Sequence, residues 1–324
     1  MIVTQTPVRL SLFGGNTDFK EYYIEHGGSV LTAAIDKYVY CIVKERFDDL
    51  IIVNYSDRES VTDVNDLKHD IAREALKLMG IEKGIEISFM ADIPGRGTGL
   101  GSSSSIAVGL LNALHTHLGQ TVSANRLAKE AIQIEIDILK NPIGVQDQYA
   151  AAFGGFKTFE FTPIWGKVRS EEVDMSISDK EDFDNSLTLF YTGVTRKAND
   201  ILSEFNVSDN IDGLYKKKRL VEDALEVLKS GDLGKFGNLL NDSWNTKRKD
   251  NTLTTNDEID SMYDLAMSAG AIGGKLIGAG GGGFLLVMFP ANKRAKIVSA
   301  LKDYKEMPFR LIDFGSRVVF NIRS

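Results

Sequence analysis

Apolar and polar residues alternate along the chain with two different periods, and the period predicts where strands and helices lie. β-Branched and aromatic residues dominate residues 8–13, 38–43 and 51–53, which is typical of strands. Over residues 66–79 the apolar side chains recur every three to four positions, which predicts a helix, and Gly80 is typical of a helix end. Residues 85–90 alternate again and are predicted to form a strand.

The rest of the chain continues this mixture. Helices are predicted from about residue 104 to 118 and from 124 to 139, the second ending before Pro142 because proline disfavours helix at the preceding residue. A strand is predicted at 187–191, several helices between 198 and 268, two short strands around a glycine run, and a final helix and strands ending at residue 320. Because strands and helices do not alternate strictly, we expect an α+β fold.

Length and composition suggest two domains. The chain has 324 residues, 43% of them hydrophobic, and domains usually contain roughly 150 residues. The stretch from 166 to 186 is acidic and poor in large apolar residues, which is typical of a junction. We therefore expect one domain over residues 1–180 and another over residues 181–324.

Charge and cysteine content exclude several classes of partner. The balance of 38 Lys and Arg against 45 Asp and Glu gives a net charge of −7, opposite to the positive field that nucleic-acid binding needs. The longest apolar stretch, residues 284–289, is far below the roughly 20 residues of a membrane-spanning helix. A single cysteine, Cys41, and a start without a signal-peptide pattern favour a reducing compartment. We expect a cytoplasmic protein that contacts neither nucleic acid nor membrane.

The strongest local signal is a loop that leads into the helix predicted from residue 104. Four glycines stand at alternating positions from 95 to 101, and four serines follow at 102–105. Glycines allow backbone N–H groups to approach an anion, and a helix N-terminus favours negative charge. Serine hydroxyls there can cap the helix or reach a magnesium ion. The loop is not a Walker motif, and an ordinary capped loop is the alternative, but so many glycines and serines favour a phosphate cradle.

Two further segments have less specific signals. Residues 278–283 satisfy the pattern G-x-G-x-x-G, but a strand follows where a dinucleotide fingerprint needs a helix. A hairpin-like turn in close contact with a neighbour or a ligand fits better, and a tight turn without a ligand is the alternative. Glu135 and Asp147, the latter in a turn after Pro142, could supply a metal ligand and a general base. Surface carboxylates are common, so this pair is informative only beside the phosphate loop.

Together these segments resemble the GHMP kinase family, whose name comes from galactokinase, homoserine, mevalonate and phosphomevalonate kinases. The similarity rests on four ordered motifs at residues 7–18, 97–103, 144–148 and 275–283. It implies an N-terminal ribosomal-protein-like α/β domain and a ferredoxin-like C-terminal domain, with ATP between them.

The resemblance also implies roles for individual residues. Ser103 and Glu135 would hold Mg²⁺, Asp147 would take the proton of the acceptor hydroxyl, and Arg9 would keep Asp147 ionised and stabilise charge during transfer. Asp18 would hold substrate hydroxyls. ATP would contact Pro94, Gly97, Gly99, Leu100, Gly101, Ser102, Ser103 and Ser104. The acceptor would contact Gly15, Asn16, Asp18, Gly144, Arg196, Lys275, Gly280 and Gly281.

Four segments carry a closer resemblance within the family: residues 13–18, 190–196, 243–248 and 273–275. In them the chain most resembles the members that phosphorylate the anomeric hydroxyl of D-glycero-D-manno-heptose 7-phosphate to give the 1,7-bisphosphate. Galactokinases typically carry Glu-His where this chain has Gly15-Asn16, which suits a larger, phosphorylated sugar. Cations predicted for the sugar phosphate are Arg196, Lys197, Lys275, Lys247 and Arg248, although a solvated surface position is at least as typical for the last two.

Other functions remain open at this point. A galactokinase-like, fucokinase-like or mevalonate-type kinase would keep the same ATP site and use another acceptor. A non-catalytic nucleotide- or sugar-binding regulator is more remote, because the proposed base and metal ligand are both present. The sequence leaves the oligomeric state undetermined and is compatible with a homodimer.

Overall fold

The computed structural model describes residues 1–94, 97–164, 167–194, 202, 205–250 and 252–322 of the chain. Arg196 and Lys197, two of the cations predicted for the acceptor, lie outside the described residues. The strands are β1 (Ile2–Phe13), β2 (Gly28–Glu45), β3 (Ile51–Asn54), β4 (Arg58–Val61), β5 (Ile85–Ala91), β6 (Phe156–Phe161), β7 (Val168–Glu172), β8 (Leu187–Tyr191), β9 (Gly273–Leu276), β10 (Phe284–Met288), β11 (Lys305–Met307) and β12 (Arg317–Asn321).

The α-helices of the described residues alternate irregularly with these strands. They are α1 (Lys20–His26), α2 (Asp70–Leu78), α3 (Ser102–His117), α4 (Ala124–Ile132), α5 (Gln146–Phe153), α6 (Ile177–Asn185), α8 (Ile211–Ser230), α9 (Leu233–Asp250), α10 (Asp257–Ala269) and α11 (Arg294–Ala300). A π-helical segment, Gln133–Ile138, continues α4.

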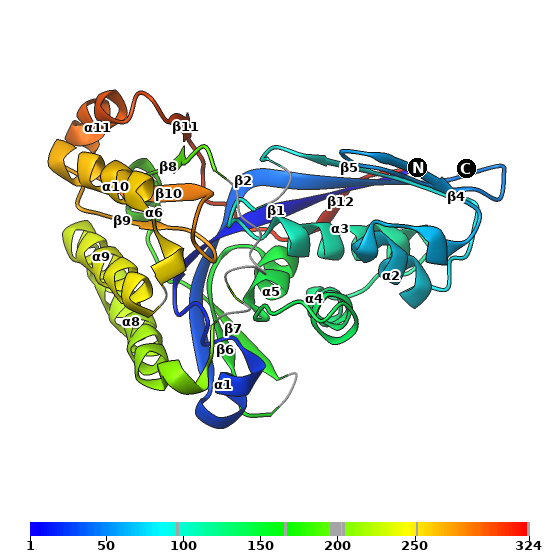
Figure 1. Cartoon of the computed structure of the whole chain (residues 1–324), viewed down its shortest axis with the longest axis horizontal. Helices are drawn as coiled ribbons and strands as arrows, with labels where there is room; N and C mark the ends of the chain where they lie inside the picture. Colours follow the sequence, from blue (N-terminus) through cyan, green and yellow to red (C-terminus); the bar gives the residue numbers. More distant parts are fainter. Residues whose placement is uncertain (95–96, 165–166, 195–201, 203–204, 251, 323–324) are drawn as a thin grey trace.

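The strands of the described residues form two sheets. The first runs in the order β12-β1-β2-β5-β3-β4, and β6 and β7 extend it from the first half of β2. Helices α2 to α5 lie together along this sheet (Figure 1). The second sheet has the order β11-β8-β10-β9, is antiparallel throughout, and lies at the other end of the molecule with α8 to α11 (Figure 1). The mixed sheets and irregular connections confirm the α+β fold class.

The chain passes between the two sheets twice. Strand β7 belongs to the first sheet and β8 to the second, so the first crossing lies between residues 172 and 187. The chain then returns, because β12 pairs with β1, with Ile2 opposite Asn321. The predicted division at residue 180 falls within the first crossing, and the last strand of the second half completes the first sheet. The domain boundary itself stays a prediction.

Several predicted elements are confirmed with different ends. Strand β1 begins at Ile2 rather than at residue 8, because Thr4 and Thr6 are buried within it and the Thr4 hydroxyl donates to the Gly109 carbonyl at 2.8 Å. Buried threonines satisfied in this way interrupt the apolar run without ending the strand. Helix α2 is shorter than predicted, and α1, α5, α6, β4, β6 and β7 were not predicted.

The two glycine runs predicted from the sequence lie against each other. A Cβ atom at Gly99 would lie 2.2 Å from the Ile277 carbonyl oxygen, and one at Gly278 would lie 2.3 Å from the Gly99 Cα atom. Both glycines have positive φ angles, +76° and +80°. The run at 278–283 is therefore a turn in close contact with a neighbour, as expected, and the neighbour is the loop that enters α3. This contact joins the loops of the two sheets at the cavity described below.

The glycine contact has a measurable consequence for stability. We expect Gly99→Ala to lower the free energy of unfolding by about 3 kcal/mol or more, because a positive φ costs about 1–2 kcal/mol and overpacking about 1–3 kcal/mol. Gly80→Ala is the matched control: Gly80 has φ +66°, but a Cβ atom added there would have no heavy atom within 4 Å. Urea denaturation of both variants measures the difference. Equal losses would show that the Gly99–Gly278 contact is unimportant.

Candidate active site

A cavity of about 410 Å³ lies where the loops of the two sheets meet. One wall consists of the loop after β1, the loop before α3 with the first turn of that helix, and the loop before α5. Helices α8 and α9 and strand β9 contribute the rest of the lining. The polar or charged side chains in its lining are Arg9, Ser11, Asn16, Asp18, His69, Asp70, Thr98, Ser102, Ser103, Ser104, Glu135, Asn141, Gln146, Asp147, Lys217, Ser243, Lys247, Thr254 and Lys275.

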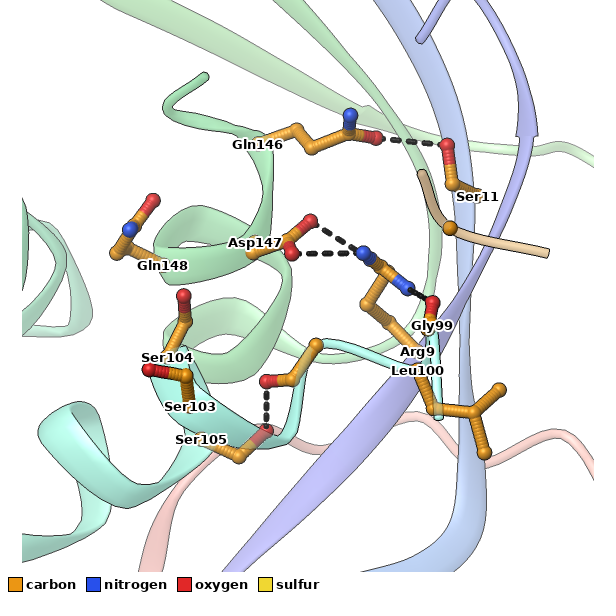
Figure 2. Close-up of polar contacts among 12 residues, drawn as sticks. Arg9, Ser11, Gly99, Leu100, Ser103, Ser104, Ser105, Gln146, Asp147 and Gln148 are labelled. Carbon is orange, nitrogen blue, oxygen red and sulfur yellow. Dashed lines mark hydrogen bonds and ion pairs between the residues drawn. The ribbon is translucent and has the colours of Figure 1, made fainter. Parts of the chain in front are cut away.

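The guanidinium of Arg9 connects three parts of this wall. Its Nε donates to Asp147 Oδ1 at 2.7 Å and its Nη2 to Asp147 Oδ2 at 2.6 Å, which is a bidentate ion pair. Its Nη1 donates to the Gly99 carbonyl at 2.6 Å (Figure 2). The Arg9 backbone N–H donates to the Leu100 carbonyl at 3.0 Å. A residue on β1 thus fixes both the glycine loop and the first turn of α5, where Asp147 lies.

Glu135 forms a second polar centre beside the N-terminus of α3. Its carboxylate is fully buried and accepts hydrogen bonds from Ser103 Oγ at 2.6 Å, Ser104 Oγ at 2.7 Å and Gln148 Nε2 at 2.7 Å. Burial raises the pKa of Glu135, while these three hydrogen bonds lower it. The buried carboxylate therefore has neutral hydrogen-bond donors on both of its oxygens.

The start of α3 can hold an anion. Gly101, with φ +77°, is the N-cap residue and contributes no side-chain cap. The first N–H groups of an α-helix have no partner within the helix, and the helix dipole favours negative charge near them. Figure 2 shows Ser103 and Ser104 on this first turn, and α3 packs against α5, which carries Asp147. Phosphate groups placed there would meet the first backbone N–H groups of α3.

Asp18 binds the turn that precedes α5. Its carboxylate accepts from the Gln146 backbone N–H at 3.0 Å, from Gln146 Nε2 at 3.2 Å and from the Asn16 backbone N–H at 3.0 Å. Gly144 permits this approach, because a Cβ atom there would lie 1.9 Å from Asp18 Oδ2. The other end of the Gln146 amide accepts from Ser11 Oγ at 2.8 Å (Figure 2). Asp18, Gly144 and Asn16 therefore lie together, as the predicted acceptor site requires.

Lysines from the second half of the chain line the opposite wall. Lys275 Nζ donates to the Leu12 carbonyl at 2.6 Å and to Ser243 Oγ at 3.1 Å. Lys247 Nζ donates to the carbonyls of Leu276 at 3.1 Å and Gly278 at 2.5 Å. Lys247 lines the cavity and is half-buried, with two carbonyl partners, which favours a position in the site over a fully solvated surface charge. Arg248 fits a surface position better, because its guanidinium pairs with Asp260 at 3.0 Å and the residue is not part of the cavity lining.

Not every predicted site residue lines the cavity. Pro94 is exposed, and Leu100 is buried in the core. Gly280 and Gly281 pack against Thr254, whose carbonyl accepts from the Gly281 N–H at 2.7 Å. The cavity-lining members of the predicted set are Arg9, Gly15, Asn16, Asp18, Gly97, Gly99, Gly101, Ser102, Ser103, Ser104, Glu135, Gly144, Asp147 and Lys275. The roles assigned to all these residues stay predictions.

Gln146 and Lys217 are among the cavity residues that sequence reasoning missed. Gln146 lies within the motif at residues 144–148, but its position beside the proposed base gave no signal of its own. Lys217 lies within a run of four basic residues, 216–219, which is typical of a solvated helix face. The signal that could have identified Lys217 is its position in the helical repeat, which places it on the same face as the apolar residues. The buried residues of α8 are Leu214, Lys217, Val221, Ala224 and Leu228.

The described residues contain no group of three or more His, Cys, Asp or Glu side chains arranged to hold a metal ion. Mg²⁺ that is bound with a nucleotide usually takes only one or two carboxylates from the protein and shares the phosphate oxygens. None of the helices in that part of the chain has the length and apolar character needed to span a membrane.

Comparison with known proteins places both halves of the chain in one family. A model of the GHMP kinase N-terminal domain matches residues 67–155, and one of the GHMP kinase C-terminal region matches residues 224–306. The D-glycero-alpha-D-manno-heptose 7-phosphate kinase of Campylobacter jejuni is 32% identical to this chain over 319 residues. The aligned region covers 93% of this chain and 93% of that kinase.

Solved structures show the same architecture. The crystal structure of a D-glycero-D-manno-heptose 1-phosphate kinase from Bacteroides thetaiotaomicron superposes with a TM-score of 0.83 at 28% identity, each chain being covered completely. A galactokinase from Lactococcus lactis, in complex with galactose, reaches a TM-score of 0.72 at 21% identity over 98% of this chain and 94% of its own, which is a similarity of fold. The two-domain fold expected from the motifs is confirmed.

The burial of Asp18 predicts a pH-dependent stability. Burial raises the pKa of Asp18 from 3.8 to about 6, against the lowering effect of the Gln146 N–H, and Asp147 adds to the rise. The folded state keeps Asp18 protonated to a higher pH than the unfolded state does. The free energy of unfolding therefore falls as pH rises from 3.8 to about 6. A shift of about two units corresponds to about 3 kcal/mol.

We therefore expect the free energy of unfolding of Asp18→Asn, relative to the native chain, to rise by about 3 kcal/mol between about pH 4 and pH 7. The hydrogen bonds that the substitution changes contribute a constant offset, so only the change with pH reports the ionisation. Urea denaturation at several pH values measures it. A difference that stays constant over this range would contradict the shift.

Proposed function

Because the chain belongs to the GHMP kinase family, we propose that it transfers the γ-phosphoryl group of ATP to the anomeric hydroxyl of D-glycero-D-manno-heptose 7-phosphate, giving the 1,7-bisphosphate. Membership makes the protein a kinase and a phosphotransferase. The names of two relatives support a phosphorylated heptose as acceptor, one with its phosphate at position 7 and the other at position 1. The choice of the 7-phosphate and of the anomeric hydroxyl is our proposal.

The observation that carries the proposal is the position of Asp147. Its carboxylate lies in the cavity wall, held by Arg9 at 2.6 and 2.7 Å, and its helix begins beside the first turn of α3. A general base for phosphoryl transfer must meet an acceptor hydroxyl directly in front of the phosphate site. Each Asp147 oxygen accepts one N–H from Arg9 and keeps lone-pair capacity for that hydroxyl. A regulator without activity would not require this arrangement.

The residues around Glu135 fit a magnesium ion bound with ATP. The Ser103 hydroxyl donates its hydrogen to Glu135, so its oxygen lone pairs remain available to a cation. Gln148 Oε1 is a buried acceptor without a hydrogen-bond partner in the described part of the chain, and a water bound to a cation could donate to it. Ser103 and Glu135 would hold the ion, which would neutralise charge on the phosphates during transfer.

The protein's own part in the reaction is positioning and proton transfer. Backbone N–H groups of residues 101–104 orient the phosphates, and Asp18, Asn16 and Gly144 position the sugar. Asp147 accepts the proton of the anomeric hydroxyl while the oxygen of that hydroxyl forms a bond to the γ-phosphorus. The bond between the γ-phosphorus and the β–γ bridging oxygen breaks, and ADP is released. Arg9 balances the charge of Asp147 before the step and lies close to the charge that develops in it.

Other acceptors are distinguished by charge. A galactokinase-like reaction needs the same base and phosphate loop but no additional cations for its neutral acceptor, and a mevalonate-type acceptor carries a single carboxylate. The lysines opposite Asp147 favour an acceptor with its own phosphate over a neutral sugar. The cytoplasmic location and the homodimer stay predictions.

Phosphorus NMR of five parallel incubations tests the proposal. The protein, ATP and Mg²⁺ are mixed in parallel with heptose 7-phosphate, heptose 1-phosphate, galactose, fucose and mevalonate. We expect a new anomeric phosphate resonance, together with ADP, from the heptose 7-phosphate sample alone. Preferred turnover of another acceptor over heptose 7-phosphate would contradict the proposed substrate. If ATP is consumed in none of the five samples, all five acceptors are contradicted.

Asp147→Asn tests the base. A positioned general base contributes typically about 10² to 10⁴ in rate, so we expect kcat to fall by at least that order. The KM for ATP should change little, because the nucleotide is proposed to contact the glycine loop and not the base. Steady-state kinetics with both substrates measures the two values. Retained turnover, or a loss confined to the KM for ATP, would show that Asp147 is not the base.

A further inference from the structure

Lysines from three different elements converge on the cavity wall opposite Asp147. Lys217 comes from α8, Lys247 from α9 and Lys275 from β9, and all three line the cavity. Lys217 and Lys275 are 6% and 7% exposed. The acceptors of Lys247 and Lys275 are carbonyl and hydroxyl oxygens, which do not neutralise an ammonium group. Removing such cations from water opposes folding, so their clustering calls for a function.

The two helical lysines stand where apolar residues are expected. On α8, Lys217 falls in the buried stripe with Leu214, Val221 and Leu228. On α9, Lys247 continues the stripe of Phe236, Leu240 and Trp244, all of them fully buried. Both stripes face the core over most of their length and end in a lysine at the cavity. The apolar stripes alone therefore do not account for a lysine at these two positions.

The lysines are close enough to act on one another. Burial is the main cause that lowers the pKa of Lys275, to about 7, and the charges of Lys217 and Arg9 lower it further. Burial also lowers the pKa of Lys247, with contributions from Lys275, Lys217 and Arg9. Four basic groups thus share one region of the cavity, and an anion that enters it favours their charged forms.

Two of the lysines lie beside the loop that is proposed to hold the sugar. Lys275 donates to the carbonyl of Leu12, just before the Gly14–Asn16 turn. Lys217 lies 5.4 Å from the ring centroid of Phe205, which in turn contacts Phe19, the neighbour of Asp18. Lys247 instead contacts the carbonyl of Gly278, whose backbone packs against Gly99 of the phosphate loop. Lys217 and Lys275 are therefore on the acceptor side, and Lys247 is between the two sides.

We propose that Lys217 and Lys275 form the binding site for the phosphate monoester that the acceptor already carries, and that Lys247 lies between this phosphate and the phosphates of ATP. The inference rests on the proposed function and adds the residues that select a phosphorylated acceptor over a neutral sugar. It assigns this selection to two buried side chains, one on α8 and one on β9. Lys275 belongs to one of the four motifs, whereas Lys217 lies outside all of them.

Titration calorimetry with ADP and Mg²⁺ present tests the site without turnover. The probes are inorganic phosphate, heptose 7-phosphate and the unphosphorylated heptose, and the variants are Lys217→Met and Lys275→Met. A hydrogen bond to a charged group corresponds to about 10- to 100-fold in affinity. We expect each variant to bind heptose 7-phosphate and inorganic phosphate more weakly by this factor, and the neutral heptose as the native chain does.

Lys216→Met is the matched control, since Lys216 is the adjacent, exposed residue of the same helix and is not part of the cavity lining. It should leave every affinity unchanged. The affinity for ADP reports whether each variant is folded, and Lys217→Arg should restore part of the lost binding.

The outcomes separate this inference from the proposed reaction. Loss of phosphate binding in Lys217→Met supports the site even when phosphorus NMR shows no heptose kinase activity. Unchanged phosphate binding in both variants overturns it even when that activity is present. Weaker binding of ADP with unchanged binding of the acceptor probes also overturns it, because the lysines would then serve the nucleotide.

Discussion

The site depends on the side chain of Arg9. From a buried position on β1, its guanidinium holds both oxygens of Asp147 and the carbonyl of Gly99, while its backbone N–H holds the Leu100 carbonyl. One residue therefore sets the distance between the phosphate loop and the proposed base. The rigid planar fork of arginine can make these contacts together, whereas a lysine could make only a subset of them. The large buried sheet around β1 keeps the fork in place.

The cavity is made by loops of two sheets, and glycines decide how closely these loops approach. Gly99 and Gly278 touch through their backbones, and Gly144 leaves room for the Asp18 carboxylate. A Cβ atom at any of these points would lie between 1.9 and 2.3 Å from a facing atom, so the walls would have to move apart. The net charge of −7 is compatible with two anionic substrates, because Arg9, three lysines and the N-terminus of α3 offset the four carboxylates of the cavity lining.

Much of this arrangement could be predicted from the sequence, for physical reasons that differ between residues. Glycine and serine runs specify a local backbone, so the phosphate loop stands out in a short segment, and Asp147 and Glu135 gain meaning from the motifs around that loop. Lys217 was not predicted, and Lys247 was predicted only beside a solvated position as an equal alternative. A basic residue on a helix is usually solvated, and only its phase within the apolar stripe distinguishes a buried lysine from a solvated one. The start of β1 and helix α1 escaped prediction because buried threonines and tyrosines there are stabilised by tertiary contacts that a local pattern does not contain.

A crystal structure of the ternary complex with a non-hydrolysable ATP analogue, Mg²⁺ and heptose 7-phosphate tests the central claim most directly. The account predicts the anomeric oxygen within about 2.6–3.2 Å of an Asp147 carboxylate oxygen and in line with the γ-phosphorus. It also predicts the 7-phosphate against Lys217 and Lys275, with Arg9 still bridging Asp147 and Gly99. A complex in which the anomeric oxygen points away from Asp147, or in which the acceptor phosphate lies apart from these lysines, would contradict it.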